Sequence, residues 1–295
     1  MKITDIFRLL RPLHYCKNIL ILFPLLFSDH PLTADALIRI FLAMAAFSFL
    51  TSAVYIYNDL ADRESDRKHP WKRRRPLASG QIGIGSAIAL SVILLLLSSG
   101  ILLLLSSPAA YLLLLIYLLL NIAYSFYLKH FPIVDIAVLS AGFLLRIYFG
   151  AVISGVVVSH WLFLTILAAS LFFSVGKRRN ELKEEQSGSR AVLKRYTLAF
   201  LDKNMYLFMA LTIVFYSQWC ISPTNQVTGE FLWTVPLLIL MLMRYSLEIE
   251  RGTDGDPVTL FFSDPVLILL SVCYGGLILY LLNLKKDLFL IFSGH

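Results

Sequence analysis

Residues 82–107 read IGIGSAIALSVILLLLSSGILLLLSS, a run of 26 residues without a charged side chain. About 20 apolar residues in a helix are enough to cross a hydrocarbon core roughly 30 Å thick. Of the 295 residues in the chain, 58% are hydrophobic and only 15% are charged. The surface of a soluble globule alone needs more charge than this. The sequence therefore predicts a polytopic membrane protein.

Similar apolar runs on both sides of this stretch predict an all-α bundle of nine transmembrane helices around a central cavity. Polar breaks set the expected boundaries at residues 14–28, 34–58, 81–106, 109–127, 134–154, 160–176, 203–222, 231–248 and 266–283. We expect residues 1–295 to form a single transmembrane domain, with loop caps at about 59–80 and 176–203.

The distribution of positive charge predicts the orientation of the bundle. If the N-terminus is cytoplasmic, 22 of the 26 Lys and Arg residues fall on the cytoplasmic side. Such an excess is typical of cytoplasmic loops, and an odd number of spans then puts the C-terminus outside. The net charge of +7 thus indicates membrane topology rather than nucleic-acid binding. Cys16, Cys220 and Cys273 are widely spaced and are expected to be small buried hydrophobic residues.

Residues 58–76 read NDLADRESDRKHPWKRRRP and place four carboxylates and seven basic residues between two apolar segments. Asn58, Asp62 and Asp66 follow each other at intervals of four. On a continued helix they project from one face over about 12 Å. Oxygen ligands in this arrangement suit Mg²⁺, which takes one or two carboxylates and shares its other positions with water and phosphates.

The remaining acidic residues of this stretch, Asp59 and Glu64, are expected to point away from that face. They also support an alternative, a solvated helix end in which Asp59 pairs with Arg63 and Glu64 pairs with Lys68.

The basic run Lys72, Arg73, Arg74 and Arg75 follows Pro70, so it is expected to lie in a loop. Lysine and arginine suit phosphate oxygens. The alternative is that these charges serve only membrane topology and contacts with anionic headgroups.

Arg146 lies within the fifth apolar span, where a charge costs several kcal/mol unless it is paired or hydrated. It follows Asp135 by three helical turns, so both lie on nearly the same stripe. We expect Arg146 to line a cavity and contact an anion; the alternative is a structural polar contact inside the bundle. Tyr124 and Lys129 close the preceding helix, where tyrosines are more often interfacial anchors than ligands.

The segment after the sixth span carries Lys177, Arg178 and Glu181, which predict a second charged cap on the same side of the membrane. A solvated helix pair joined at residues 187–189 would show the same charge pattern.

The Asn58-x-x-x-Asp62-x-x-x-Asp66 ladder at the end of a second span resembles the UbiA superfamily of intramembrane prenyltransferases, and the resemblance covers nearly the entire chain. It implies a helical bundle whose central cavity opens laterally to lipid, with Mg²⁺ held by aspartate-rich motifs under cytoplasmic loops. Members that use prenyl diphosphates carry a second DxxxD-type motif after the sixth helix. This chain has KRRNEL at residues 177–182 instead.

Separate local strings resemble better the branch that includes decaprenyl-phosphate phosphoribosyltransferase. They are RP at 11–12 with KN at 17–18, HP-x-KR-x-RP at 69–76, PIVD at 132–135 with LR at 145–146, GSRAVLKRY at 188–196, and ERG at 250–252 before DP at 256–257. This branch implies transfer of 5-phosphoribose from phosphoribosyl diphosphate to a polyprenyl phosphate at the cytoplasmic face of a bacterial-type inner membrane, in cell-envelope biosynthesis.

The resemblance also implies roles for the candidate residues. The metal and the diphosphate are assigned to Asn58, Asp62 and Asp66; the donor phosphates to Lys72, Arg73 and Arg75; the acceptor phosphate to Lys17, Lys129 and Arg146; the donor ribose or its 5-phosphate to Lys177, Arg178 and Glu181; and further substrate contacts to Tyr124 and Asp135. The expected partners are the two substrates and the membrane, and a homo-oligomer remains an open alternative.

Two other functions fit part of this pattern. One is a prenyltransferase that moves an isoprenoid from its diphosphate to an aromatic or other small acceptor, which the missing second aspartate motif argues against. The other is a transporter or lipid-binding scaffold. The sequence shows no evident repeated half, which many transporters have, and a transporter has no evident reason to pair acids and bases at one helix end.

Overall fold

The computed structural model describes residues 3–28, 32–68, 72–184, 192–222, 229–252 and 257–293. Every regular element within these ranges is a helix, which confirms the predicted all-α class. Contacts between Cα atoms divide the chain into two compact units, the first formed by the chain up to Val158 and the second mostly by the helices that follow. The prediction of a single domain over residues 1–295 stays a prediction.

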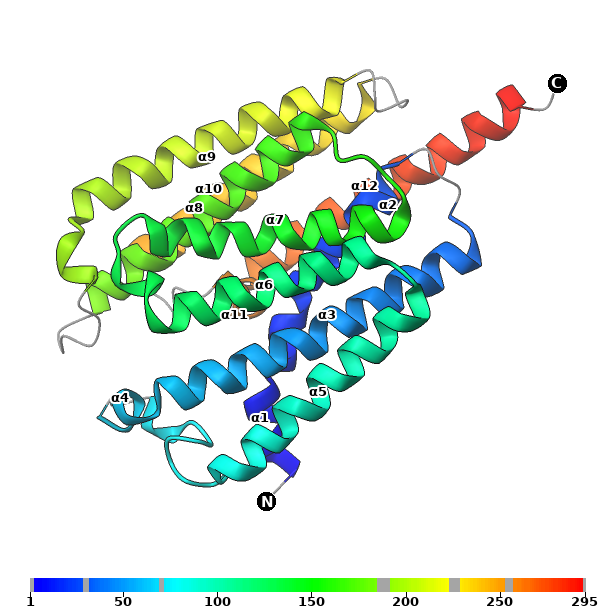
Figure 1. Cartoon of the computed structure of the whole chain (residues 1–295). Coiled ribbons are helices and arrows are strands. Elements are labelled where there is room, and N and C mark those ends of the chain that lie inside the picture. The colour runs from blue at the N-terminus through cyan, green and yellow to red at the C-terminus, as the bar shows by residue number, and fades with distance from the viewer. Residues whose placement is uncertain are drawn as a thin grey trace. The chain divides into compact units, whose positions relative to one another are not determined.

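The first unit contains four long helices, and the connection between the third and fourth lies at the same end as the short helix α4 (Figure 1). Its elements are α1 (Ile3–Leu10), η1 (Pro12–Ile21), α2 (Phe23–Leu26), α3 (Ala34–Ala61), α4 (Arg63–Lys68), η2 (Lys72–Arg74), α5 (Ile84–Leu105), α6 (Pro108–Phe126), η3 (Leu128–His130) and α7 (Val134–Ser154). Thr33 caps the start of α3 by accepting a hydrogen bond from the Ala36 amide.

The second unit also contains four long helices. Its elements are α8 (His160–Glu184), η4 (Leu193–Arg195), α9 (Leu198–Ile221), η5 (Glu230–Thr234), α10 (Val235–Arg251), α11 (Pro257–Ser263) and α12 (Pro265–Ser293). Helix α10 ends at Arg251, and the φ of 83° at the following Gly252 is the left-handed conformation that commonly closes a helix.

Eight helices in the described part of the chain are long and apolar enough to span a membrane, and they correspond to the second to ninth predicted spans. The first predicted span, residues 14–28, is not one α-helix: it consists of the 3₁₀ segment η1 and the single turn α2. This segment still runs beside α3, because Arg11 contacts Asp59 at 2.6 Å and Asn18 contacts Ser48 at 2.8 Å. The predicted number of nine is therefore approximate.

A close backbone approach holds η1 against α7. A Cβ atom built on Gly150 would lie 1.9 Å from the carbonyl oxygen of Ile21, so only glycine fits at this position of α7. Nearby, Phe47 packs against Tyr117 and Phe149 at ring-centroid distances of 4.8 and 5.3 Å. These rings belong to a hydrophobic core shared by η1, α3, α5, α6 and α7.

Several expected boundaries were wrong. Helix α8 continues through Lys177 to Glu184, so the predicted cap at 176–203 begins as helix rather than loop. Residues 185–191 of that cap and residues 69–71 of the cap at 59–80 lie outside the described residues.

The three cysteines were expected to be buried. Cys220 is buried, whereas Cys16 and Cys273 are exposed.

Candidate active site

A cluster of acidic and basic side chains lies where α3 ends. Asp59 and Asp66 are 3% and 4% exposed, and both accept hydrogen bonds from the same Arg75 nitrogen, at 3.0 and 2.7 Å. Asp59 also accepts a hydrogen bond from the Arg11 guanidinium at 2.6 Å. Two buried carboxylates thus share one arginine, and a second arginine binds one of them. We call Asp59, Asp66, Arg11 and Arg75 the carboxylate cluster.

The backbone explains why these two aspartates meet. Asp62 interrupts the helix between α3 and α4, yet its amide still donates to the Asn58 carbonyl at 2.9 Å, and the Asp66 amide donates to the Asp62 carbonyl at 2.8 Å. Helical spacing therefore persists through the interruption. Asp59 and Asp66 are seven residues apart, which is close to two helical turns, so they project to the same side.

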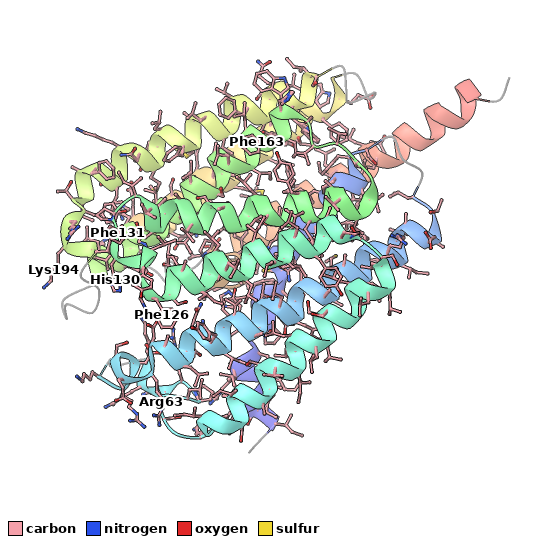
Figure 2. All side chains as sticks on the ribbon, viewed as in Figure 1. Arg63, Phe126, His130, Phe131, Phe163 and Lys194 are labelled. Atoms are coloured by element: carbon pink, nitrogen blue, oxygen red, sulfur yellow. The ribbon has the colours of Figure 1, made fainter. Side chains whose placement is uncertain are left out.

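The predicted ladder of Asn58, Asp62 and Asp66 divides between two neighbours. Asn58 accepts a hydrogen bond from the Ser125 hydroxyl, and Asp62 accepts one from Lys129 at 2.7 Å, so both face the end of α6 and the following turn. Figure 2 shows Phe126 and His130, which flank Lys129, and Arg63 of α4 at this end of the unit. Asp66 instead contacts Arg75.

Asp59 was expected to point away from the face shared by Asn58, Asp62 and Asp66. It contacts Arg75 together with Asp66, whereas Asn58 and Asp62 face the end of α6, so the prediction that Asp66 lies apart from Asp59 was wrong. The seven-residue spacing from Asp66 was a signal for this position, but the four-residue spacing to Arg63 suggested a surface pair instead. Glu64 is exposed and pairs with Arg67 at 3.0 Å, as a solvated helix end does.

Burial affects the protonation of one member of the cluster, Asp66. It raises the pKa of Asp66 above the ordinary value, and the positive charge of Arg75 opposes that shift without cancelling it. An additional cation beside Asp66 would favour the charged carboxylate.

The donor atoms of the cluster suit Mg²⁺, which prefers carboxylate and amide oxygens. Within the described ranges, no three His, Cys, Asp or Glu side chains converge as a ready-made metal cage. This is compatible with Mg²⁺, which typically takes only one or two carboxylates and completes its shell with water and substrate phosphates. Asp59 and Asp66, joined through one Arg75 nitrogen, are such a pair.

The predicted basic loop forms the 3₁₀ turn η2, and the Arg75 amide closes it on the Lys72 carbonyl at 2.9 Å. Arg75 reaches the carboxylates, Lys72 is partly buried and Arg73 is exposed. Of this run, the structure therefore brings Arg75 directly to the acidic residues.

Arg146 makes a structural polar contact, the alternative that the sequence left open. It is 4% exposed and donates to Asn18 at 2.9 Å, to the Gly142 carbonyl at 2.6 Å and to the Tyr117 hydroxyl at 3.2 Å. Its guanidinium also lies 4.9 Å from the centre of the Phe47 ring. The expectation of an anion-contacting, cavity-lining residue is not supported by these contacts.

Three other candidates belong to other elements of the first unit. Lys17 is partly buried in η1, Tyr124 is partly buried near the end of α6, and Asp135 is fully buried in the first turn of α7. Their assignment to substrate stays a prediction.

The second unit has paired charges of its own. Arg178 is 1% exposed and donates to Glu181 one turn further along α8, while Lys177 on the same helix is partly buried. Arg244, which no site prediction included, binds Asp264 at 2.6 Å and Glu248 at 2.9 Å. The four-residue spacing of Arg244 and Glu248 was a signal for this pairing.

Asp264 also begins helix α12. Its carboxylate accepts a hydrogen bond from the Leu267 amide at 2.7 Å, and the bond from Arg244 holds the pKa of Asp264 below its ordinary value. This aspartate therefore stays charged at neutral pH and joins α10 to α12.

The membrane-length helices and the buried carboxylates held by arginine define an integral membrane protein with a charged site at one end of a helical unit. The chain belongs to the UbiA prenyltransferase family, whose sequence model matches residues 19–283.

The curated relatives extend this similarity over nearly the whole chain. Decaprenyl-phosphate phosphoribosyltransferase of Corynebacterium glutamicum is 33% identical, with 90% of this chain and 82% of that protein covered. The protein of the same name from Mycobacterium tuberculosis is 31% identical, with 92% of each chain covered. The family and these relatives identify the chain as an enzyme of the transferase class.

Solved structures show the same fold. A UbiA homologue from Archaeoglobus fulgidus, bound to GPP and Mg²⁺, has a TM-score of 0.68 at 19% identity, with 94% of this chain and 98% of that chain covered. An apo UbiA homologue from Aeropyrum pernix has a TM-score of 0.66 at 17% identity.

Proposed function

We propose that this enzyme transfers 5-phosphoribose from phosphoribosyl diphosphate to a polyprenyl phosphate and releases diphosphate. The main support is the similarity to decaprenyl-phosphate phosphoribosyltransferases over at least 82% of their length. The second support is the segment after the sixth predicted span, where Arg178 pairs with Glu181 and the sequence has no second aspartate-rich motif.

In this reaction the bond between C1 of ribose and the diphosphate oxygen breaks, and the diphosphate leaves with the electron pair. An oxygen of the lipid phosphate forms the new bond to C1. A phosphate monoester is largely ionised at neutral pH because its second pKa is about 6, so the nucleophile needs no dedicated base. The protein has to bind two anions close together and stabilise the charge that develops on the leaving group.

We assign the metal to Asn58, Asp62 and Asp66, and we add Asp59 because it shares Arg75 with Asp66. Bound Mg²⁺ supplies charge neutralisation for the diphosphate. Arg75 keeps the two buried carboxylates together and also offers nitrogens to donor phosphates, with Lys72 and Arg73 as further donors. We assign the acceptor phosphate to Lys129, which already lies beside Asp62, and to Lys17.

We propose that the chemistry takes place at the cytoplasmic face of a bacterial-type inner membrane. Support comes from the basic residues, since the segments rich in Lys and Arg include the stretch from α4 through η2 and the C-terminal part of α8. The N-terminus is then cytoplasmic and the C-terminus is outside.

The test uses membranes that contain the protein, phosphoribosyl diphosphate labelled in the ribose, Mg²⁺ and polyprenyl phosphate, followed by extraction of the lipid. We expect label in the lipid fraction, and we expect Asp66→Asn to abolish it. Unlabelled geranylgeranyl diphosphate serves as a competitor. If it blocks labelling as well as unlabelled phosphoribosyl diphosphate does, or if no label enters the lipid, the assignment of the donor is wrong.

A further inference from the structure

A cavity of about 470 Å³ lies beside Asp59 in the first unit, and this volume is within the usual range for small-molecule sites. Its lining includes four arginines, Arg8, Arg11, Arg74 and Arg75, against the single carboxylate of Asp59. Because a guanidinium is always charged in proteins, the wall of the cavity is strongly positive. A concave site of this kind concentrates anions.

The arginines come from two segments that are far apart in the sequence and meet in one small hydrophobic core. Leu9, next to Arg8, is fully buried, and Leu77, close to Arg74, is 1% exposed. Both pack with Ile56 of α3. This core joins the end of α1 to the segment after η2, so the backbone that carries the arginines is held in place before a ligand binds.

Two lining residues, Arg11 and His14, also contact one aromatic ring. The Arg11 guanidinium lies 5.2 Å from the centre of the Tyr55 ring, and the ring of His14, another lining residue, lies 5.5 Å from the same ring. Arg11 is therefore held by stacking as well as by its bond to Asp59. Planar guanidinium groups held in this way match the oxygens of a phosphate.

We propose that this cavity, which we call the arginine cavity, binds a phosphate monoester beside the carboxylate cluster, with which it shares Asp59, Arg11 and Arg75. The inference deepens the proposed function, because both substrates of that reaction carry a phosphate monoester: the 5-phosphate of the sugar donor and the phosphate of the lipid acceptor. Arg8 and Arg74 are the residues that test the proposal, since they line the cavity without belonging to the carboxylate cluster as defined above.

The arginine cavity differs from the phosphate site expected from the sequence, in which Lys177, Arg178 and Glu181 bind the donor ribose or its 5-phosphate. Arg178 is 1% exposed and already donates to Glu181, so it has little surface to offer a ligand. Arg8 and Arg74 are both exposed beside a cavity.

The first measurement is binding of radiolabelled inorganic phosphate to the purified full-length protein in detergent micelles, by equilibrium dialysis. We expect the double variant Arg8→Ala/Arg74→Ala to bind phosphate at least about tenfold more weakly than the wild type, because two charge-assisted contacts are lost. Arg8→Lys/Arg74→Lys should recover part of the binding. The matched control is Arg195→Ala, which removes an exposed arginine of η4 outside the cavity.

The second measurement identifies the source of the monoester through steady-state kinetics of lipid labelling. A rise of about tenfold in KM for phosphoribosyl diphosphate alone assigns the cavity to the sugar phosphate, and the same rise for polyprenyl phosphate alone assigns it to the lipid. Phosphate binding by Arg8→Ala/Arg74→Ala within twofold of the wild type overturns the proposal. A wild type that binds phosphate but labels no lipid contradicts the proposed reaction and leaves the phosphate site standing.

Discussion

Replacing Arg75 by glutamine tests whether one arginine holds the carboxylate cluster together. Arg75 binds Asp59 at 3.0 Å and Asp66 at 2.7 Å, whereas Asp59 keeps Arg11 at 2.6 Å when Arg75 is removed. The cost therefore falls mainly on Asp66, whose side chain is only 6% exposed. Removing one partner of a buried ion pair typically costs 3–5 kcal/mol. Because the Arg75 side chain is 29% exposed and partly screened, we expect Arg75→Gln to lower the free energy of unfolding by about 3 kcal/mol at pH 7.

The pH dependence of this loss follows from the pKa of Asp66. Burial raises that pKa above its value in the unfolded chain, so the folded protein binds more protons, and its free energy of unfolding rises, as the pH falls through the folded pKa toward about 4. Arg75→Gln removes the charge that lowers the pKa, which moves the titration to higher pH. The difference between wild type and variant should therefore shrink to about 1 kcal/mol once Asp66 is protonated in both proteins.

The assay is equilibrium unfolding in mixed detergent micelles, followed by tryptophan fluorescence, on a double-mutant cycle of Arg75→Gln and Asp66→Asn. We expect the double variant to lose about 1–2 kcal/mol less than the sum of the single variants. The matched control is Arg67→Gln, which removes an ion pair with the exposed Glu64 and a hydrogen bond to the Ala78 carbonyl at 3.2 Å, with an expected loss in the free energy of unfolding of about 1 kcal/mol. Additive losses that do not change with pH would refute the shared-arginine interpretation.

Three further predictions concern other parts of the molecule. Gly150→Ala should lower the free energy of unfolding by at least about 1–3 kcal/mol in the same assay, because its Cβ would lie 1.9 Å from a backbone oxygen. The control is Gly142→Ala on the same helix, whose Cβ would have its nearest neighbour at 3.5 Å. Its free energy of unfolding should stay within about 1 kcal/mol of the wild type. Asp264→Asn should lower stability at neutral pH. Because Arg244 lowers the pKa of Asp264, the wild type should lose this advantage as the pH falls below about 4, while a constant difference at all pH values would contradict the role of the charge. Removing divalent cations with EDTA should abolish lipid labelling, and Mg²⁺ should restore it; labelling that persists in EDTA would exclude the proposed metal requirement.

The helical class and eight of the spans were predictable because each depends on local composition. A run such as residues 82–107 crosses a membrane whatever its neighbours are, and α5 indeed occupies Ile84–Leu105. The end of α8 was less predictable. Gly176 suggested a boundary, but the following residues are mostly good helix formers, and α8 continues to Glu184.

Local spacing gave one signal for the position of Asp59, its seven-residue interval from Asp66, but its arginine partners were not predictable, because they come from distant parts of the chain. Arg11 precedes it by 48 residues and Arg75 follows it by 16. Arg11 reaches Asp59 from a left-handed backbone conformation, with a φ of 54°, at the junction between α1 and η1. That conformation is uncommon for a residue other than glycine, and no sequence pattern indicated it.

Arg146 shows how the interior of the first unit supports the site at its end. A buried arginine in a membrane helix suggested either a ligand contact or a structural contact. Its bond to Asn18, and the bond from Asn18 to Ser48 of α3, tie η1 to both α7 and α3. Because η1 has 3₁₀ rather than α-helical hydrogen bonds, these side-chain contacts supply part of the rigidity that a regular helix would have. The same segment starts next to Arg11, so the charge buried at Arg146 helps to fix the arginine that binds Asp59.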